Sequence, residues 1–578
     1  MSYELMLQKA VELHQNGALN EAEKLYRQIL AAAPENADAW NMLGLVAQAK
    51  SLHEQAIECF EQAIKYAPQH FPLYFNMAVS LGALNKNAEA IAAYQKTLEL
   101  QPNLPEAHTA LGNIYWEQKQ IAEAQAAFQH ALNIKNDYLP ARVNLAEMLD
   151  DTATLEQLAQ QDNVEALFYL GRRALKAQNY AQAVQYLSKA DGLSESAEIK
   201  FVLGQALENN GDKDVALQKY YQALALQSND DEIMTHIADL EAENGESATA
   251  EKCYKRALTL NPQNLAAHVN LANLLCSKNR TVEALEEYRQ AVLLAPDKPE
   301  ICYNLALVVK SAADYEQALA LMFQAFYASP PRDDWALNIA ETLMLYAAEE
   351  PKKAQIIAAN WLKKMPQYVV AEHIEAVLKG QKSAVEKEYN RLLFENFAQN
   401  YEQTLQKINY AVVAKMAELY APLNGKILDL GCGSGLVAER LKNNENSFIG
   451  VDISPKMLEL ARNKKVYDEL VESDIEAYLQ QNQHSLPPTI IAADVFCYFG
   501  DLVSIFKLCA PQRLIFSVEI NTKIQDFAQQ INGRYQHNPQ WVEKQLQAAG
   551  YKKINTTKIT LRQENNLAVE GMLFSAAS

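Results

Sequence analysis

A step of 34 residues separates repeated pairs of a small and a bulky residue over the first two thirds of the chain. Prolines close the repeated units at the same step, at Pro34, Pro68 and Pro102, and later at Pro262, Pro296 and Pro330. A fixed period of this length is typical of arrays in which each unit is one supersecondary element and stacked neighbours share a core. The recurring pairs are Ala22/Tyr26, Ala56/Phe60, Ala90/Tyr94, Ala124/Phe128, Ala216/Tyr220, Ala250/Tyr254, Ala284/Tyr288 and Ala318/Met322.

Each unit predicts two amphipathic helices joined by a turn, as in residues 40–68. Small residues such as Gly44 fall where paired helices must approach closely, and bulky ones such as Phe60 fill the space between them. The closing proline ends the second helix, because it lacks an N–H group and clashes with the preceding turn. The pattern resembles the tetratricopeptide repeat over residues 3–366. Clear units begin near Tyr3, Ala37, Phe71, Pro105, Val164, Ala197, Asp231, Leu265 and Pro299, a partial unit begins at Leu139, and a degenerate unit begins at Asp333.

The period breaks between residues 147 and 163, where the second helix of the expected pattern is missing. We therefore expect two subarrays with a kink between them. The resemblance implies an all-α superhelical solenoid over residues 1–366, with about nine to eleven repeats and a concave face lined by the first helix of each unit. It also implies that a protein or peptide partner binds in that groove.

Asparagine recurs at the sixth position of the first helix in several units. This row resembles the asparagine ladder in the repeat arrays of O-linked N-acetylglucosamine transferases, where amides hold an extended peptide. An amide suits that role because it donates and accepts hydrogen bonds at once. The alternative is that each asparagine only bonds a neighbouring helix. The candidate peptide-binding residues are Asn76, Asn144, Asn270 and Asn304, and the row is interrupted at Ala110, Tyr169, Val202 and His236.

After Pro366 the period is lost, and residues 367–392 predict linking helices. Short apolar runs then alternate with helical segments, which indicates a parallel sheet covered on both faces. Two further strands, at 553–562 and 567–575, fit an antiparallel closing hairpin. We therefore predict an α/β domain over residues 393–578 with a seven-stranded, mostly parallel sheet, similar to Rossmann-like class I methyltransferases. The first five predicted strands are 426–431, 447–452, 470–474, 489–494 and 513–519.

The glycine-rich segment 429–435, Asp-Leu-Gly-Cys-Gly-Ser-Gly, follows the first of these strands and opens a helix. Glycines suit a tight turn that a ligand approaches at the backbone. A dinucleotide-binding loop would place a third glycine where Leu436 stands. The segment instead resembles motif I of class I methyltransferases, in which the helix N-terminus faces the methionine carboxylate of S-adenosylmethionine. The resemblance implies that this cofactor contacts Asp429, Gly431, Cys432, Gly433 and Gly435.

Acidic residues end the next two strands. Asp452, followed by Ile453, lies about 20 residues beyond the loop, as a carboxylate that accepts both ribose hydroxyls should. Asp474 and Ile475 end the third strand, where members of the class bond the adenine amino group and pack its ring. Five further segments look like those of bacterial predicted methyltransferases that contain tetratricopeptide repeats. These segments are 394–410, 492–502, 516–519, 533–538 and 561–574.

Two residues are candidates for positioning or deprotonating the methyl acceptor. Asp494 ends the fourth strand, where the class keeps its catalytic face. His537 is the other, because an unperturbed histidine titrates near neutral pH, although Asn538-Pro539 also predicts a helix cap with the histidine at a surface corner. Two interpretations remain open for Tyr401 and Tyr410: they form a lid over the cofactor, or they belong to the apolar core.

Charge and composition disfavour several other classes of protein. A net charge of −19 argues against nucleic-acid binding, which rests largely on Lys and Arg. The sequence contains no long apolar run and no apolar segment typical of a signal peptide near its start, so we expect no membrane span and a cytoplasmic location. The seven cysteines lack metal-ligand spacing, so we predict no metal site. DNA amino methylation is also disfavoured, because residues 492–499 (Ala-Ala-Asp-Val-Phe-Cys-Tyr-Phe) stand where its Asn/Asp-Pro-Pro-Tyr/Phe motif would follow the fourth strand.

Three functional classes follow from these patterns. The first is a methyltransferase that modifies a protein or peptide recruited by the repeats. The second is a methyltransferase for a small molecule or a glycan, with the repeats used to assemble a complex. The third is a scaffold that no longer catalyses, which the intact glycines and acids disfavour.

Overall fold

The computed structural model describes residues 3–530, 533–564 and 567–578. Residues 565 and 566, inside the segment 561–574 named above, therefore lie outside the described residues. The chain divides into two compact units, Met1–Pro262 and Gln263–Ser578. Among the described residues, we find no helix with the length and apolar character needed to cross a membrane.

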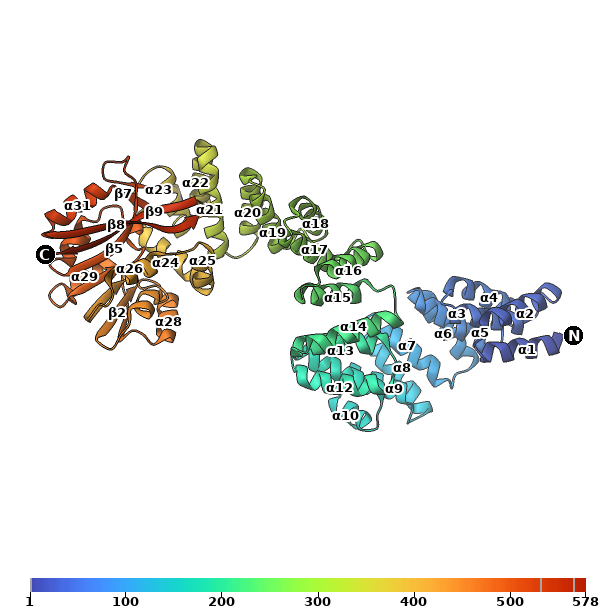
Figure 1. Ribbon diagram of the computed structural model, residues 1–578. Helices are drawn as coiled ribbons and strands as arrows, with labels where there is room; N and C mark the ends of the chain where they lie inside the picture. Colours follow the sequence, from blue (N-terminus) through green and yellow to red (C-terminus); the bar gives the residue numbers. More distant parts are fainter. Residues whose placement is uncertain (1–2, 531–532, 565–566) are drawn as a thin grey trace. The chain divides into compact units, whose positions relative to one another are not determined.

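The first unit consists of antiparallel helix pairs that stack in chain order, drawn from blue to green in Figure 1. Its first helices begin at the residues expected from the 34-residue period, Leu139 included. The helices are α1 (Tyr3–Gln15), α2 (Leu19–Ala32), α3 (Ala37–Ala49), α4 (His53–Tyr66), α5 (Phe71–Ala83), α6 (Asn87–Leu100), α7 (Pro105–Glu117), α8 (Ile121–Ile134), α9 (Leu139–Met148), α10 (Thr152–Gln160), α11 (Val164–Lys176), α12 (Tyr180–Leu193), α13 (Ala197–Asn210), α14 (Lys213–Leu226), α15 (Asp231–Glu243) and α16 (Ser247–Leu260).

Close contact between the helices of a pair explains why glycine recurs on the first helix. A Cβ atom added at Gly204 would lie 2.4 Å from Cε1 of Tyr220, and one at Gly44 would lie 2.6 Å from Cε1 of Phe60. Both rings are fully buried. The glycine on the first helix therefore makes room for the bulky residue of the second, and Gly112 and Gly171 make the same kind of contact with Phe128 and Leu187.

The expectation of a missing helix between residues 147 and 163 is wrong. A second helix is present there as α10, but it has nine residues where α8 and α12 each have fourteen. Asp151 caps it, because its side chain accepts a hydrogen bond from the backbone N–H of Thr154. The sequence period breaks because this helix is short.

The second unit begins with further helix pairs whose core continues toward the sheet. Tyr389 of α24 is buried with the side chains of α21 to α23 and stacks on His373, with ring centroids 3.8 Å apart. Helix α24 therefore packs against the last repeated helices. The helices are α17 (Leu265–Ser277), α18 (Thr281–Leu294), α19 (Pro299–Ser311), α20 (Tyr315–Ala328), α21 (Asp333–Glu349), α22 (Pro351–Lys364), α23 (Val369–Leu378), α24 (Glu386–Phe397), the 3-10 turn η1 (Ala398–Asn400), α25 (Tyr401–Lys407) and α26 (Val412–Tyr420).

A mixed sheet follows, drawn in orange and red in Figure 1. Its main path is β3-β2-β1-β4-β5, all parallel, with β9 antiparallel to β5 and β8 antiparallel to β9. The short strands β6 and β7, which sequence did not predict, extend the sheet beyond β5. The strands are β1 (Gly425–Leu430), β2 (Asn446–Asp452), β3 (Glu469–Glu472), β4 (Thr489–Ala492), β5 (Arg513–Ile520), β6 (Phe527–Gln529), β7 (Tyr535–His537), β8 (Lys553–Glu564) and β9 (Leu567–Ala577).

Helices cover both faces of this sheet. Leu428 and Leu430 of β1 share one apolar cluster with α29 (Ile475–Asn482), α30 (Val503–Cys509) and α31 (Pro539–Ala548). Ile427 points to the opposite face, where it packs with α26 and α27 (Leu436–Leu441). The strands alternate between two buried faces, which explains their nearly continuous apolar sequence. Helix α28 (Pro455–Lys464) joins β2 to β3, and the 3-10 turn η2 (Phe496–Tyr498) follows β4.

Candidate cofactor and acceptor site

The carboxyl ends of the parallel strands open into a cavity of about 870 Å³. In open α/β sheets, ligands bind at this edge. The cavity collects residues from the loops that follow β1, β2, β3 and β4, and α24 contributes a further wall. The predicted site residues that line it are Tyr401, Gly431, Gly433, Asp452, Ile453, Asp474, Ile475 and Asp494. Four other predicted site residues are absent from the described lining of the cavity: Asp429, Cys432, Gly435 and His537.

The loop after β1 has a backbone that only glycine adopts easily. Gly431 has φ +64°, in the left-handed region. A Cβ atom placed there would lie 2.6 Å from Cγ2 of Val495, so a larger residue would displace the segment that follows β4. The loop therefore presents its bare backbone to the cavity, as the sequence predicts.

Asp452 is held by backbone donors at the end of β2. Its Oδ2 accepts a hydrogen bond from the Gly433 N–H at 2.8 Å, and its Oδ1 accepts one from the Ser454 N–H at 2.9 Å. Burial raises the pKa of this carboxyl group, and the backbone N–H groups oppose that shift. A carboxylate has about four lone-pair positions, so Asp452 retains acceptor capacity toward the cavity.

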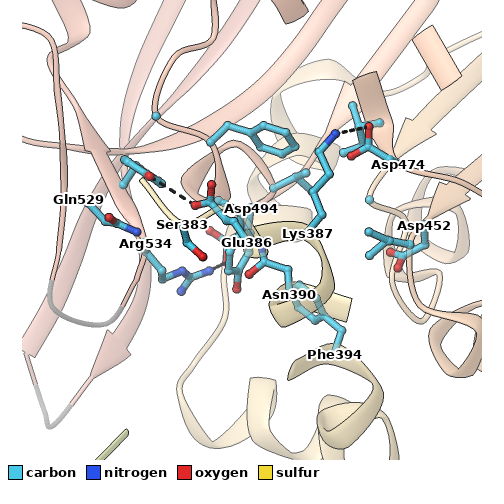
Figure 2. Close-up of a pocket in the computed structure, with 18 of the residues that line it drawn as sticks. Ser383, Glu386, Lys387, Asn390, Phe394, Asp452, Asp474, Asp494, Gln529 and Arg534 are labelled. Carbon is cyan, nitrogen blue, oxygen red and sulfur yellow. Dashed lines mark hydrogen bonds and ion pairs between the residues drawn. The ribbon is translucent and has the colours of Figure 1, made fainter. Parts of the chain in front are cut away.

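Asp474 makes a contact that sequence did not predict. It caps α29 by accepting a hydrogen bond from the Ala477 N–H, and Lys387 Nζ lies 3.0 Å from the same oxygen. Figure 2 shows Lys387 reaching from α24 to this carboxylate, with Asp452 below it. Helix α24, which packs on the repeated helices through Tyr389, thus also bonds to the strand end predicted to hold adenine.

Asp429 lies below the loop and is almost fully buried. Its Oδ2 accepts a hydrogen bond from the Tyr467 hydroxyl at 2.6 Å, and its Oδ1 has no hydrogen-bond partner among the described residues. Burial raises the pKa of this carboxyl group to about 7. Asp429 therefore supports the loop from below and does not line the cavity. One of its two buried oxygens remains unbonded among the described residues.

Asp494 belongs to a buried network of charges. Arg534 Nη2 lies 3.0 Å from its Oδ2, and Arg562 Nη1 lies 3.6 Å from its Oδ1. Both guanidinium groups also contact Glu519 Oε1, at 3.3 Å from Arg534 and 2.5 Å from Arg562. Arg562 Nε additionally lies 2.6 Å from Glu564 Oε1. We call Asp494, Glu519, Arg534, Arg562 and Glu564 the charge network.

A β-bulge delivers Arg562 to this network. The register between β8 and β9 shifts between Thr560 and Arg562, so that both Leu561 and Arg562 are buried. Simple alternation along β8 would bury only one of two consecutive residues. Sequence reasoning missed Arg562 for this reason. Glu519, Arg534 and Arg562 nevertheless each lie in one of the segments that carried the family resemblance.

The same network argues against a metal ion. Ligand atoms of Asp494, Cys497 and Glu519 lie within 4.8 Å of one another. Two arginines already neutralise these carboxylates, and a divalent cation would be repelled by them. Cys497 is buried, and burial raises the pKa of its thiol. These contacts describe an ion-pair network beside a buried thiol.

His537 is not brought to Asp494. It is fully buried in β7, where its Nε2 lies 3.0 Å from the Gly500 carbonyl oxygen. Burial lowers its pKa. Asn538 does cap α31, as expected from the Asn-Pro pair, but the histidine lies in the core and not at a surface corner. Of the two tyrosines, Tyr401 lines the cavity, whereas Tyr410 packs against the apolar cluster below α26.

Asn76 and Asn144, both candidates for the peptide ladder, bond neighbouring helices. Asn76 Nδ2 donates to Asn41 Oδ1 at 3.0 Å, and Asn144 Nδ2 donates to Asn113 Oδ1 at 2.8 Å. Each bond joins first helices of successive pairs, as the alternative to a peptide ladder predicts. All four candidates, Asn270 and Asn304 included, are half-buried.

Comparison with known proteins finds two kinds of family along the chain. A family model described as "Methyltransferase domain" matches residues 427–512. Models for the tetratricopeptide repeat match residues 13–81, 80–119, 105–138, 170–231 and 236–299. The chain carries tetratricopeptide repeats and a methyltransferase domain. The match to the methyltransferase domain begins inside β1 and ends before β5, so it includes the strand ends that line the cavity.

Individual relatives resemble parts of the chain. "Putative methyltransferase YqeM" of Bacillus subtilis (strain 168) is 27% identical over 23% of this chain and 58% of its own length. "Protein O-mannosyl-transferase TMTC1" of Mus musculus is 25% identical over 28% of this chain and 17% of its own length. Among solved structures, the TPR domain of P58(IPK) covers 64% of this chain and 93% of its own, with 17% identity and a TM-score of 0.27. The chain thus spans less than two thirds of each of these two sequence relatives.

Proposed function

We propose that this protein is an S-adenosylmethionine-dependent methyltransferase. The observation that carries the proposal is the convergence of the glycine loop, Asp452 and Asp474 on one cavity at adjacent strand ends. When bound, the cofactor supplies a methyl group activated on a sulfonium. The chain's own residues would bind it, orient the acceptor and exclude water.

The residues present fit this cofactor. At Gly433 a Cβ atom would meet nothing closer than the Tyr401 hydroxyl at 3.6 Å, so the bare backbone leaves room there that a side chain would fill. Asp452 retains the acceptor capacity that two ribose hydroxyls need, and Ile453 and Ile475 offer apolar surface beside it. Asp474 would bond the adenine amino group once it shares or releases Lys387. The remaining predicted contacts, Asp429, Cys432 and Gly435, would act by supporting the loop.

Asp494 suits positioning better than proton transfer. Arg534 and Arg562 approach its two oxygens, so the carboxylate is held in one place at the cavity wall. Its backbone is also constrained, with φ +56° and its N–H group donating to the Ser517 hydroxyl at 2.8 Å. We assign Asp494 the role of orienting the acceptor, and His537 a structural role.

Cofactor binding is tested by calorimetric titration of the full chain with S-adenosylhomocysteine. We expect micromolar affinity for the wild type and a loss of about 30- to 100-fold for Asp452→Ala, because two hydrogen bonds to a charged group are removed. Glu459→Gln is the matched control, since this residue is an exposed acid on α28, next to the same strand. Absence of binding by the wild type would refute the proposal.

We further propose that the repeats recruit the protein or peptide that is methylated. Tetratricopeptide repeats generally mediate protein–protein interactions, and the chain devotes most of its length to them. The second candidate is a small-molecule or glycan methyltransferase whose repeats assemble a complex. The charge network favours neither, because its residues would orient either kind of acceptor.

Deleting residues 1–262 separates these two candidates. The cut follows the boundary between the compact units, whereas a cut at residue 366 would divide the core that joins Trp335 to Tyr389. We expect the shortened chain to bind S-adenosylhomocysteine normally but to lose transfer of labelled methyl groups to proteins of a cell lysate. Undiminished protein labelling would contradict recruitment by the deleted repeats. Labelling confined to small molecules, in both chains, would favour the second candidate.

A further inference from the structure

The cavity has a second end that the cofactor residues do not use. Figure 2 shows Asp452 and Asp474 on one side of the cavity and Gln529 and Arg534 on the opposite side. Aromatic side chains from the segment after η2 and from β6 and β7 gather at this opposite end, and α24 contributes a carboxylate. We call it the aromatic end and define it by Glu386, Phe499, Phe527, Gln529 and Tyr535, which all line the cavity.

A glycine allows two of these rings to pack on the backbone. A Cβ atom at Gly500 would lie 2.6 Å from Phe527 Cε2 and 2.8 Å from Tyr535 Cε1. The two rings meet edge to face, with centroids 6.1 Å apart. Phe527 and Tyr535 therefore form a fixed aromatic corner, supported from behind by the loop after η2.

A carboxylate faces this corner, and the cation that acts on it, Lys382, forms no ion pair with it among the described residues. Glu386 Oε1 accepts a hydrogen bond from the Tyr535 hydroxyl at 3.3 Å. Among the described residues, no Lys or Arg side chain forms an ion pair with Glu386. Burial raises the pKa of this carboxyl group, and the Tyr535 hydroxyl and the positive charge of Lys382 oppose that shift. A half-buried carboxylate is costly to desolvate unless a cation or several donors compensate it.

The nearby arginines do not supply that compensation. Arg534 is paired with Asp494 and Glu519, and Arg562 is paired with Glu519 and Glu564. The charge network thus holds three acids and two bases. Adding Glu386 and Lys382, which acts on it, leaves this side of the cavity with four acids and three bases. An anionic acceptor would be repelled here, whereas a cationic one would supply the missing charge.

We propose that the aromatic end binds an alkylammonium group, such as a lysine side chain of a polypeptide, as the methyl acceptor. Ring faces and a carboxylate together attract ammonium groups, because the quadrupole of each ring is negative on its face. This inference rests on the proposed function. The amine nitrogen would release one proton to solvent and use the freed electron pair to form the nitrogen–carbon bond. The carbon–sulfur bond would break with its electron pair remaining on sulfur.

Binding of a lysine probe to the full chain tests the inference without any turnover. We would titrate Nα-acetyl-lysine methylamide in the presence of S-adenosylhomocysteine and follow its NMR signals by saturation transfer. The norleucine analogue, which has the same alkyl chain without the amine, is the matched ligand. We expect norleucine to bind at least about tenfold more weakly, because it leaves Glu386 uncompensated.

Two variants of α24 locate the site. Glu386→Gln is expected to lower the affinity for lysine by about tenfold, because it removes the charge but retains the shape. Glu395→Gln makes the same change on the same helix, in a residue that pairs with Arg391 outside the cavity lining, and should leave the affinity unchanged. Binding of S-adenosylhomocysteine by each variant reports whether the cavity is folded.

The outcomes separate the two proposals. Equal binding of lysine and norleucine, unchanged lysine binding by Glu386→Gln, or tighter binding of an Nα-acetyl-glutamate probe would overturn the alkylammonium site while leaving the methyltransferase proposal intact, provided that S-adenosylhomocysteine still binds. Failure of the wild type to bind S-adenosylhomocysteine would instead refute the proposed function.

Discussion

Replacing Arg562 by methionine is expected to lower the stability of the sheet by about 3 to 5 kcal/mol, which is the cost of leaving buried acids without their partner. Arg562 is 2% exposed, and Glu519, its closest partner, is 1% exposed. With Arg562 removed, Arg534 alone would face both Asp494 and Glu519. Native-state hydrogen exchange of peptides from β5 and β8 would measure the change in the free energy of opening.

A second substitution and a control make this prediction specific. Adding Glu519→Gln to Arg562→Met should recover part of the loss, because it removes one of the three acids that the arginine contacts. Lys558→Met, on the same strand as Arg562, removes an exposed ion pair with Glu570 of β9 and should cost less than about 1 kcal/mol. Equal losses of stability from Lys558→Met and Arg562→Met would contradict the prediction, because the buried charge network would then contribute no more than an exposed ion pair.

Replacing Gly431 by valine is expected to abolish binding of S-adenosylhomocysteine, with a loss on the order of 100-fold or more, equivalent to about 2.7 kcal/mol. The valine would have to adopt φ +64° and would place Cβ 2.6 Å from Val495 Cγ2. The loop would shift away from the position in which the Gly433 N–H donates to Asp452. Calorimetric titration measures the loss.

Gly425→Val is the matched control for that experiment. Gly425 lies at the start of the same strand and has φ +80°, but a Cβ atom there would meet nothing within 4 Å. It therefore carries a similar backbone strain without the collision. We expect its affinity for S-adenosylhomocysteine to stay within about threefold of the wild type, since the site is unchanged. Comparable losses of affinity in the two variants would show that backbone strain in β1, and not the collision with Val495, weakens binding.

Regular local patterns made much of the fold predictable. The first helices begin at the expected residues because the 34-residue period records which side chains pack within each pair, and that packing depends on near neighbours in the chain. The strand ends that carry Gly431, Asp452, Asp474 and Asp494 were predictable for a similar reason. Parallel strands place their carboxyl ends at one edge, so residues far apart in sequence meet there.

Other predictions failed where a local irregularity changed the pattern. Helix α10 is present but short, so a search for a fourteen-residue helix missed it. Strands β6 and β7 have three residues each, too few to show an alternation. The bulge at Arg562 buries two consecutive residues of β8, which hides a charged site residue in what looks like an ordinary edge strand.

The sequence by itself determined the repeats, the sheet and the edge of the sheet at which a cofactor would bind, because each depends on spacing along the chain. Only the tertiary structure decided which charges meet. Lys387 reaches Asp474 across 87 residues, and Arg562 reaches Glu519 across 43. Such pairs are set by how helices and strands pack, and no spacing rule records them. The carboxylate of Glu386 at the aromatic end is visible as a candidate only once α24 is seen to line the cavity.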